Sequence, residues 1–296
     1  MTGASAAMPE GRARPRHPAA RFLSRLFLHP GAMIGTIVFT TLVLAAIFAP
    51  LIAPYDWNDT DVGMRLAPPS AEHFFGVDIH GRDIFSRVVA GGRYSISLGI
   101  ATVLLSLSVG SAIGIFLGFV GGRIDAWGCR FIDVLLGFPA IVLAIMIVSV
   151  LGVGLVNVVL AVAIAGVPRF ARVVRGATMV VREQLYVEAA RALGASDIRI
   201  MLRHLLPNVT PTLVVLGTLD LGNAILSTAT LSFLGLGAQP PTPEWGAMLS
   251  SGREFMRYAP WMMIFPGLAL FLVVMSVNLV GDRLSQVLDP KAKDRR

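Results

Sequence analysis

Long stretches without charged side chains constrain this chain more than any other feature of its sequence. Four of them, residues 31–54, 94–122, 134–168 and 259–281, contain no Asp, Glu, Lys or Arg, and a fifth, 209–236, contains only Asp220. A helix of about 20 apolar residues is enough to cross the ~30 Å hydrocarbon core of a bilayer. Each stretch is therefore long enough to span a membrane.

The stretch 134–168 is too long for one crossing, because its 35 residues would form a helix of about 52 Å. A Gly-Val-Gly break around Gly152 predicts a tight turn in its middle. Two spans result, one starting near Phe131 and the other ending near Arg175. The chain is thus predicted to be an all-α integral membrane protein with six transmembrane helices.

Composition agrees with a membrane protein. Hydrophobic residues make up 55% of the chain, charged residues 15%, and the mean hydropathy is +0.71, whereas soluble domains carry roughly 25% charged residues. These values exclude a disordered chain and a nucleic-acid-binding domain. Cys129 is the single cysteine, which excludes an internal disulfide and a thiolate metal cluster, and no metal site is predicted.

The distribution of basic residues predicts the orientation. If the N-terminus is cytoplasmic and the spans alternate, most of the 25 lysines and arginines fall on the cytoplasmic side, as the positive-inside rule requires. This predicts an N-in, C-in topology. A cleaved signal peptide is disfavoured, since its apolar region would be only about 7–15 residues long. The predicted segments are a basic cytoplasmic N-terminus (1–30), a first transmembrane helix (31–54), an extracytoplasmic loop (55–92) with a short interfacial helix over 84–89, and a basic cytoplasmic tail (283–296).

Three glycines recur at every fourth position of the second span, namely Gly110, Gly114 and Gly118. Small residues at this spacing let helix backbones approach closely in lipid. We interpret them as a site of tight helix packing within the chain rather than as a dimer face.

The cytoplasmic segment between the fourth and fifth spans has the pattern of two short helices. The first covers about 183–193, and Gly194 suits the position after a helix end, where φ is often positive. Ser196 is a plausible N-cap for the second helix, whose apolar residues Ile198, Met201, Leu202 and Leu205 follow helical spacing. Pro207 is expected to start a new segment. The apolar face has two possible uses, a protein partner or the ends of the chain's own spans.

This segment resembles a known motif. Glu188-Ala189-Ala190, Gly194 and Leu206-Pro207 fall in register with the EAA motif of binding-protein-dependent ABC importers, EAA-x3-G-x9-I-x-LP. His204 occupies the Ile position, a departure that resembles the Arg-His-hydrophobic-Leu-Pro-Asn form of the peptide-transporter branch. Residues 183–207 are called the EAA loop below.

Further motifs extend the resemblance over all but about the first 25 residues. They resemble the second, C-type permease of dipeptide and oligopeptide (peptide/nickel) ABC importers. The segments that carry this resemblance are Phe75-Gly76-Val77-Asp78, Gly81-Arg82-Asp83, Leu231-Ser232-Phe233-Leu234-Gly235-Leu236-Gly237, Pro240-Pro241-Thr242-Pro243-Glu244-Trp245-Gly246 and Leu288-Asp289-Pro290.

The resemblance implies a type I ABC importer permease fold, with the permease domain over 93–282, in a bacterial inner membrane. It implies a homologous B-type permease, two cytoplasmic ATPases and an extracytoplasmic binding protein as partners. ATP and Mg²⁺ would belong to the ATPases, because this chain has no Walker A motif and no lysine before Lys291. The chain would be a carrier subunit and not an enzyme. Peptides are the favoured solute, with glutathione and nickel as alternatives.

Two sets of residues are candidates for function. The EAA loop would couple the chain to an ATPase through Glu188, Ala189, Ala190, Gly194, His204, Leu206 and Pro207. The alternative for Glu188 is a solvated pair with Arg191.

Asp220 is the one acid well inside an apolar span, and such groups are functional candidates by default. It would line the solute path, with Asn223 and Asn278 as weaker candidates because asparagine often joins helices. The alternative for Asp220 is an ion pair with the partner permease or a place nearer the interface. For the chain as a whole, a transporter driven by an ion gradient is the rival class.

Overall fold

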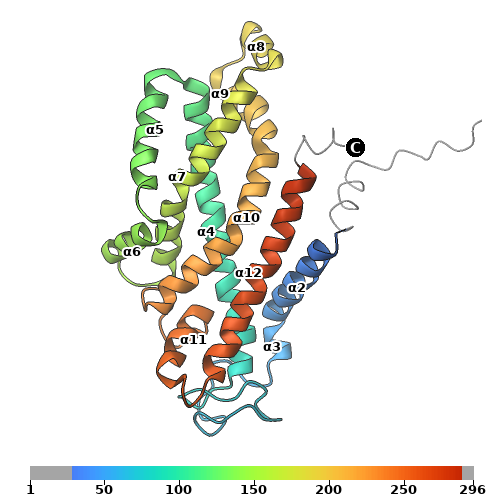
Figure 1. Ribbon diagram of the computed structural model, residues 1–296, viewed down its shortest axis with the longest axis vertical. Helices are drawn as coiled ribbons and strands as arrows, with labels where there is room; N and C mark the ends of the chain where they lie inside the picture. The colour runs from blue at the N-terminus through green and yellow to red at the C-terminus, as the bar shows by residue number, and fades with distance from the viewer. Residues whose placement is uncertain (1–28, 289–296) are drawn as a thin grey trace, which may run out of the picture.

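The computed structural model describes residues 29–288, and within this range the chain is an elongated bundle of helices without a β-strand (Figure 1). The first helices are α2 (Pro30–Ile47), α3 (Ala49–Ile52), α4 (Ile84–Val120), α5 (Gly122–Leu136), α6 (Ala140–Leu151) and α7 (Leu155–Arg182). They are followed by α8 (Leu185–Ala192), α9 (Asp197–Ile200), the π-helical turn η1 (Met201–Leu205), α10 (Leu206–Phe233), α11 (Trp245–Gly252), the 3-10 turn η2 (Arg253–Phe255) and α12 (Trp261–Leu288).

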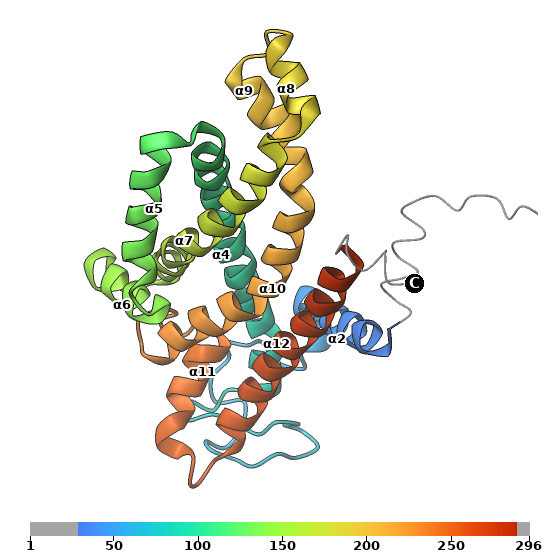
Figure 2. The ribbon, with the colours of Figure 1, turned by 45° about the horizontal axis from the view of Figure 1, so that its top comes forward.

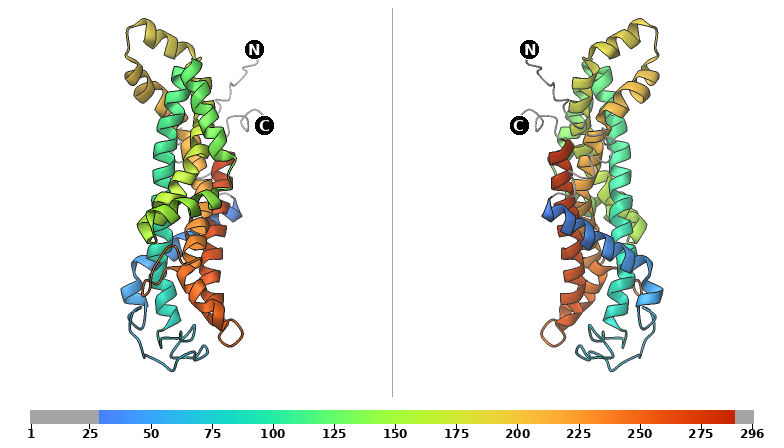
Figure 3. Two further views of the ribbon diagram at one scale, coloured as in Figure 1. Left: turned by 90° about the vertical axis from the view of Figure 1, so that its left-hand side faces the viewer. Right: turned by 90° about the vertical axis from the view of Figure 1, so that its right-hand side faces the viewer.

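The helices α4, α7, α10 and α12 run along the bundle, with α2 beside α12 on one flank and the pair α5–α6 on the other (Figures 1 and 2). The segment that contains α8 and α9 projects from one end. The loop between α3 and α4 lies at the opposite end (Figure 3). The EAA loop and the predicted extracytoplasmic loop are therefore separated by the whole length of the bundle.

Five helical segments in the described range are long and apolar enough to cross a membrane, and a sixth crossing results if the bent pair α5–α6 counts as one. The break predicted around Gly152 is confirmed, since α6 ends at Leu151 and α7 begins at Leu155. Gly152 and Gly154 have φ of 90° and 141°, values that favour glycine. The third span differs from a straight helix, because α5 and α6 meet at 90°.

The second span begins earlier than predicted. The prediction of a separate interfacial helix over 84–89 is wrong, because these residues form the first turns of the 37-residue helix α4. The carboxylate of Asp83 caps this helix by accepting a hydrogen bond from the Ser86 amide at 2.8 Å. The predicted loop 55–92 therefore ends at residue 83.

The glycines of α4 lie directly against α7. A Cβ atom added at Gly114 would lie 2.6 Å from the Ala171 carbonyl oxygen, and one added at Gly118 would lie 2.8 Å from the Arg175 carbonyl oxygen. At Gly110 it would lie 2.6 Å from Cβ of Phe170. Only hydrogen fits at these positions, so the two helix backbones touch along three successive turns.

Substituting Gly114 by alanine is expected to destabilise the permease by about 1–3 kcal/mol, because the new methyl group overlaps backbone that cannot yield. The measurement is the midpoint of thermal unfolding of the purified protein in detergent. Gly176→Ala on α7 is the matched control, since a Cβ there meets no atom within 4 Å. Equal stability of the two variants would contradict the interpretation of these glycines as packing positions.

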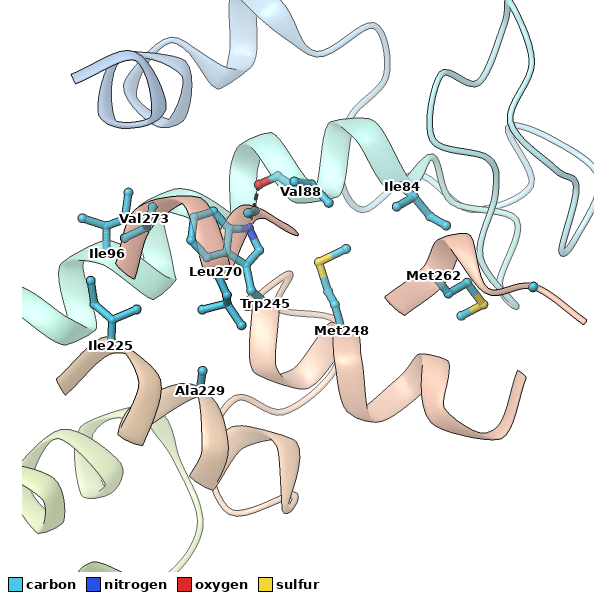
Figure 4. Packing of buried hydrophobic residues seen from close by; sticks show 12 residues of the cluster. Ile84, Val88, Ile96, Ile225, Ala229, Trp245, Met248, Met262, Leu270 and Val273 are labelled. Carbon is cyan, nitrogen blue, oxygen red and sulfur yellow. Dashed lines mark hydrogen bonds between the residues drawn. The ribbon is translucent and has the colours of Figure 1, made fainter. Parts of the chain in front are cut away.

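A buried apolar cluster joins α4, α10, α11 and α12 near the end opposite the EAA loop (Figure 4). Trp245 lies at its centre, and its indole Nε1 donates a hydrogen bond to the Val88 carbonyl oxygen at 2.9 Å. Ile225 and Val273 pack from α10 and α12. This cluster fixes the start of α4 relative to the helices that follow it in sequence.

Candidate functional site

The EAA loop folds as a helix, a sharp turn and a second helix, as its pattern predicts. Gly194 follows α8 with φ of +78°, and its amide donates to the Arg191 carbonyl oxygen at 3.0 Å. The Ala195 amide donates to the Ala190 carbonyl oxygen at 3.1 Å. This pair of bonds is a Schellman motif, whose left-handed residue is usually glycine. Ser196 stands at the N-cap of α9 without a side-chain cap bond.

Three apolar side chains of the EAA loop pack against the bundle. Val187, Ile200 and Leu205 are buried, and they pack with Phe119 of α4 and Val174 of α7. Of the predicted apolar face, Leu205 is buried against the bundle whereas Ile198 and Leu202 are exposed, so part of the face packs on the chain's own spans and part is open to a partner. The exposed large aliphatic side chains of the loop are Leu185, Leu193, Ile198 and Leu202.

Pro207 does not start a separate segment, contrary to the prediction. The helix continues from α9 through η1 into α10, and Pro207 occupies the first turn of α10. The preceding turn is a π-turn, in which the Leu206 amide donates to the Met201 carbonyl oxygen. π-Helical geometry is rare, and it occurs mostly as a single-turn bulge inside an α-helix. The result is one helical segment from Asp197 to Phe233.

The candidate residues of the EAA loop differ in how exposed they are. Glu188 lies in the first turn of α8 and is exposed, next to the buried Val187. The ring of His204 lies 6.4 Å from that of Tyr186. At the outer surface, Ala189, Gly194 and Pro207 are exposed, whereas Ala190 and Leu206 are half-buried.

Asp220 forms an ion pair with a cation of its own chain. Its Oδ1 lies 2.5 Å from Nη1 of Arg169 on α7. Because Arg169 already balances the negative charge of Asp220, the alternative of an ion pair between Asp220 and the partner permease is not needed. Asn223 follows one turn later on α10, and all three residues line the same cleft.

This cleft encloses about 400 Å³ between α4, α6, α7 and α10. Besides the ion pair and Asn223, its lining includes Thr102, Ser106 and Ser227 among apolar residues. The Arg169 side chain is 53% exposed and that of Asp220 16%. A charged group this exposed at membrane depth must face water or another chain, because contact with lipid is too costly.

Asn278 lies apart from that cleft. It is exposed on α12 and lines an apolar groove with Leu226 and Asp282. Its Oδ1 would lie 3.0 Å from a Cβ added at Gly222 of α10. The three sequence candidates for the solute path are thus divided between two surfaces, with Asp220 and Asn223 on one and Asn278 on the other.

Sequence reasoning missed two further ion pairs on α7. Arg172 pairs with Asp133, and Arg175 pairs with Asp125 through two hydrogen bonds of 2.5 Å. Both acids lie on α5, so α7 is joined to α5 by charge as well as by packing. The signal was the spacing of arginines at positions 169, 172 and 175, which places them on successive turns of one helix.

Glu244 was also missed, although it lies in a recognised motif. It is fully buried and caps α11 by accepting hydrogen bonds from the amides of Gly246 and Ala247 at 3.0 and 2.9 Å. The Ser95 hydroxyl of α4 donates to it at 3.1 Å. Burial raises the pKa of this carboxyl above its ordinary value, and the two amide donors act in the opposite direction. Glu244 joins α11 to α4.

A bundle of membrane-spanning helices, a polar cleft among them and a helical loop projecting from one end define a multi-pass membrane permease. The chain belongs to the family described as binding-protein-dependent transport system inner membrane component, whose profile matches residues 110–294. A second profile, described as the N-terminal TM domain of oligopeptide transport permease C, matches residues 18–69. The protein is thus an inner-membrane permease of an ABC importer, of the C type. This membership overrules the alternative of a transporter driven by an ion gradient.

Two relatives cover nearly the whole chain. The glutathione transport system permease protein GsiD of Escherichia coli O1:K1 / APEC is 48% identical over 279 residues, which are 94% of this chain and 92% of the relative. The dipeptide transport system permease protein DppC of Alkalihalophilus pseudofirmus is 46% identical over 262 residues, 88% of this chain and 86% of the relative.

The fold also matches a solved structure. The inward-facing MetNI methionine ABC transporter (CY5 native crystal form) superposes with a TM-score of 0.57 at 20% identity, over 70% of this chain and 98% of that chain. The predicted type I importer fold is confirmed.

Proposed function

We propose that this chain forms, with a homologous B-type permease, the path by which the importer moves short peptides, glutathione among them, into the cell. The observation that carries the proposal is the Arg169–Asp220 pair on the cleft. A short peptide presents an ammonium and a carboxylate on one small polar molecule, and this cleft presents one partner for each. The solutes in the names of the two relatives, glutathione and dipeptides, belong to this chemical class.

The EAA loop supports the part of the proposal that concerns energy coupling. Glu188 and the exposed apolar side chains around it form a surface of mixed character at the end of the bundle, and exposed apolar patches of this kind mark protein contacts. In this proposal the loop binds one of two cytoplasmic ATPase subunits, which hold ATP and Mg²⁺, and an extracytoplasmic binding protein delivers the solute. In this proposal the ATPase subunits hydrolyse ATP, and this chain serves as the carrier.

Uptake in cells tests the solute class. A strain without this gene receives the intact chain or an empty vector, and is offered labelled dialanine, a labelled pentapeptide, labelled glutathione and radioactive nickel in separate assays. The other subunits stay at their natural levels. We expect the intact chain to restore uptake of at least one of the peptide solutes, and ATP depletion to abolish that uptake.

The outcomes separate the candidates. Restored peptide or glutathione uptake supports the proposal and selects among its solutes. Restored uptake of nickel alone contradicts the peptide assignment while leaving the family unchanged. Because the binding protein selects the solute first, the assay uses the binding protein that is native to the system.

A further inference from the structure

Arg182, the last residue of α7, contacts the C-terminal end of α4. Its Nη1 donates hydrogen bonds to the carbonyl oxygens of Gly118 and Phe119, at 3.0 and 3.2 Å. Both carbonyls belong to the final turn of α4, which ends at Val120. The same guanidinium binds the Glu183 carboxylate through Nε and Nη2, at 3.1 and 2.9 Å. Arg182 thus joins α4 to the first residue of the EAA loop.

The chemistry of this contact suits a strong and directional link. The last carbonyls of a helix have no partner within the helix, and they lie at the negative end of its dipole. A guanidinium offers a rigid fork of donors and remains charged at all physiological pH values. Gly121 leaves room for it, because a Cβ there would lie 3.1 Å from Nη1 of Arg182.

Arg191, a cation of the loop itself, contacts the same turn of α4. The guanidinium carbon of Arg191, in the last turn of α8, lies 5.5 Å from the ring centre of Phe119, a distance typical of a cation–π contact. Phe119 also packs with the buried Val187 of α8. The two ends of α8 are therefore tied to one turn of α4, by Arg182 before the helix and by Arg191 at its end.

Helix α4 leads from this contact to the far end of the bundle. Its 37 residues correspond to a rod of about 56 Å. At the other end Asp83 caps it, and the Val88 carbonyl oxygen accepts the hydrogen bond from Trp245. A displacement applied to the final turn of α4 is therefore carried to the cluster around Trp245 (Figure 4).

We propose that Arg182 is a positioning residue that passes movement of the EAA loop to α4, so that ATP-driven motion at one end of the bundle opens the path at the other. This inference rests on the proposed coupling role of the loop. It assigns the link to a side chain outside the EAA motif itself. The neighbouring bond to Glu183 holds the guanidinium in place for this task.

The test uses the full complex with both permeases, the ATPases and the binding protein, reconstituted in proteoliposomes. Arg182→Met keeps the length of the side chain and removes every donor, whereas Arg182→Lys keeps the charge. Three quantities are measured: retention of the ATPase subunits, ATP hydrolysis stimulated by the binding protein loaded with glutathione or dialanine, and solute moved per ATP. Arg123→Met, an exposed arginine at the same end on α5, is the matched control.

We expect Arg182→Met to retain the ATPase subunits and to lower solute moved per ATP about tenfold, since hydrogen bonds to a charged group are the interactions lost. Lysine should restore part of the ratio, and Arg123→Met should leave it unchanged. An unchanged ratio in Arg182→Met, or a loss that follows only from lost assembly, overturns the inference.

A parallel measurement on Glu188→Arg separates the two proposals. If Glu188→Arg loses the ATPase subunits while Arg182→Met behaves as the intact chain, the loop keeps its coupling role and only the role of Arg182 fails. If Glu188→Arg leaves all three quantities unchanged, the coupling role of the loop fails, and the role of Arg182 fails with it.

Discussion

Replacement of Glu188 by arginine is expected to lower ATP-driven solute uptake at least about 100-fold. The substitution reverses the charge of a residue proposed to contact the ATPase, and a mismatched charge in an interface costs several kcal/mol. Glu188 is exposed while its neighbour Val187 is buried against the bundle. The substitution therefore changes the outer surface of α8 and leaves its packing intact. The measurement is uptake of the solute identified in the complementation assay, at matched amounts of permease in the membrane.

Two variants serve as controls for this result. Glu188→Gln removes the charge without reversing it, and we expect a smaller loss of about tenfold. Asp197→Arg reverses an exposed acid elsewhere in the same loop, outside the residues that match the EAA motif, and should leave uptake close to that of the intact chain. Equal effects of the two charge reversals would mean that the loop responds to net charge and not to Glu188.

The Arg169–Asp220 pair gives the second large effect. Asp220→Asn leaves the Arg169 cation without its carboxylate, and we expect peptide uptake to fall at least about tenfold, since charge-assisted hydrogen bonds are worth roughly 1.5–3 kcal/mol. The full loss of a buried pair would cost more, but Arg169 is half exposed, which lowers the figure. The measurement is uptake together with thermal stability of the purified complex.

Exchange of the two charges distinguishes a solute contact from a structural bond. In Arg169→Asp/Asp220→Arg the helices α7 and α10 can still pair. If the pair meets the solute, stability returns in the double variant while uptake stays low, because each charge now occupies the wrong wall of the cleft. Recovery of both stability and uptake would show that the pair only joins the helices.

The spans and the EAA loop were predictable because their signals are local. A run of uncharged residues decides whether a helix can sit in lipid, and the positive φ at Gly194 follows from its place after an amphipathic helix. A break follows from length, since 134–168 exceeds one bilayer crossing, and the glycines around position 152 place it. These conclusions need no knowledge of which helices are neighbours.

The features that were missed depend on neighbours far away in the chain. Asp220 finds Arg169 at a separation of 51 residues, and Asp125 finds Arg175 at a separation of 50. The spacing of the arginines on α7 places them on successive turns, but it does not reveal which acids they meet. The continuity of the helix at Pro207 was missed for a different reason. A π-turn over Met201–Leu205 directly precedes the proline, and the sequence pattern does not reveal this irregular turn.

The contact between α4 and α7 limits how this protein can change shape. Because backbone meets backbone at Gly110, Gly114 and Gly118, a slide of one helix along the other would drive a side chain into a carbonyl group at each step. Sliding of α4 along α7 is therefore blocked, and the two helices must move together as one rigid body. The pivots for inward and outward opening then belong to the looser border of this pair, toward α12.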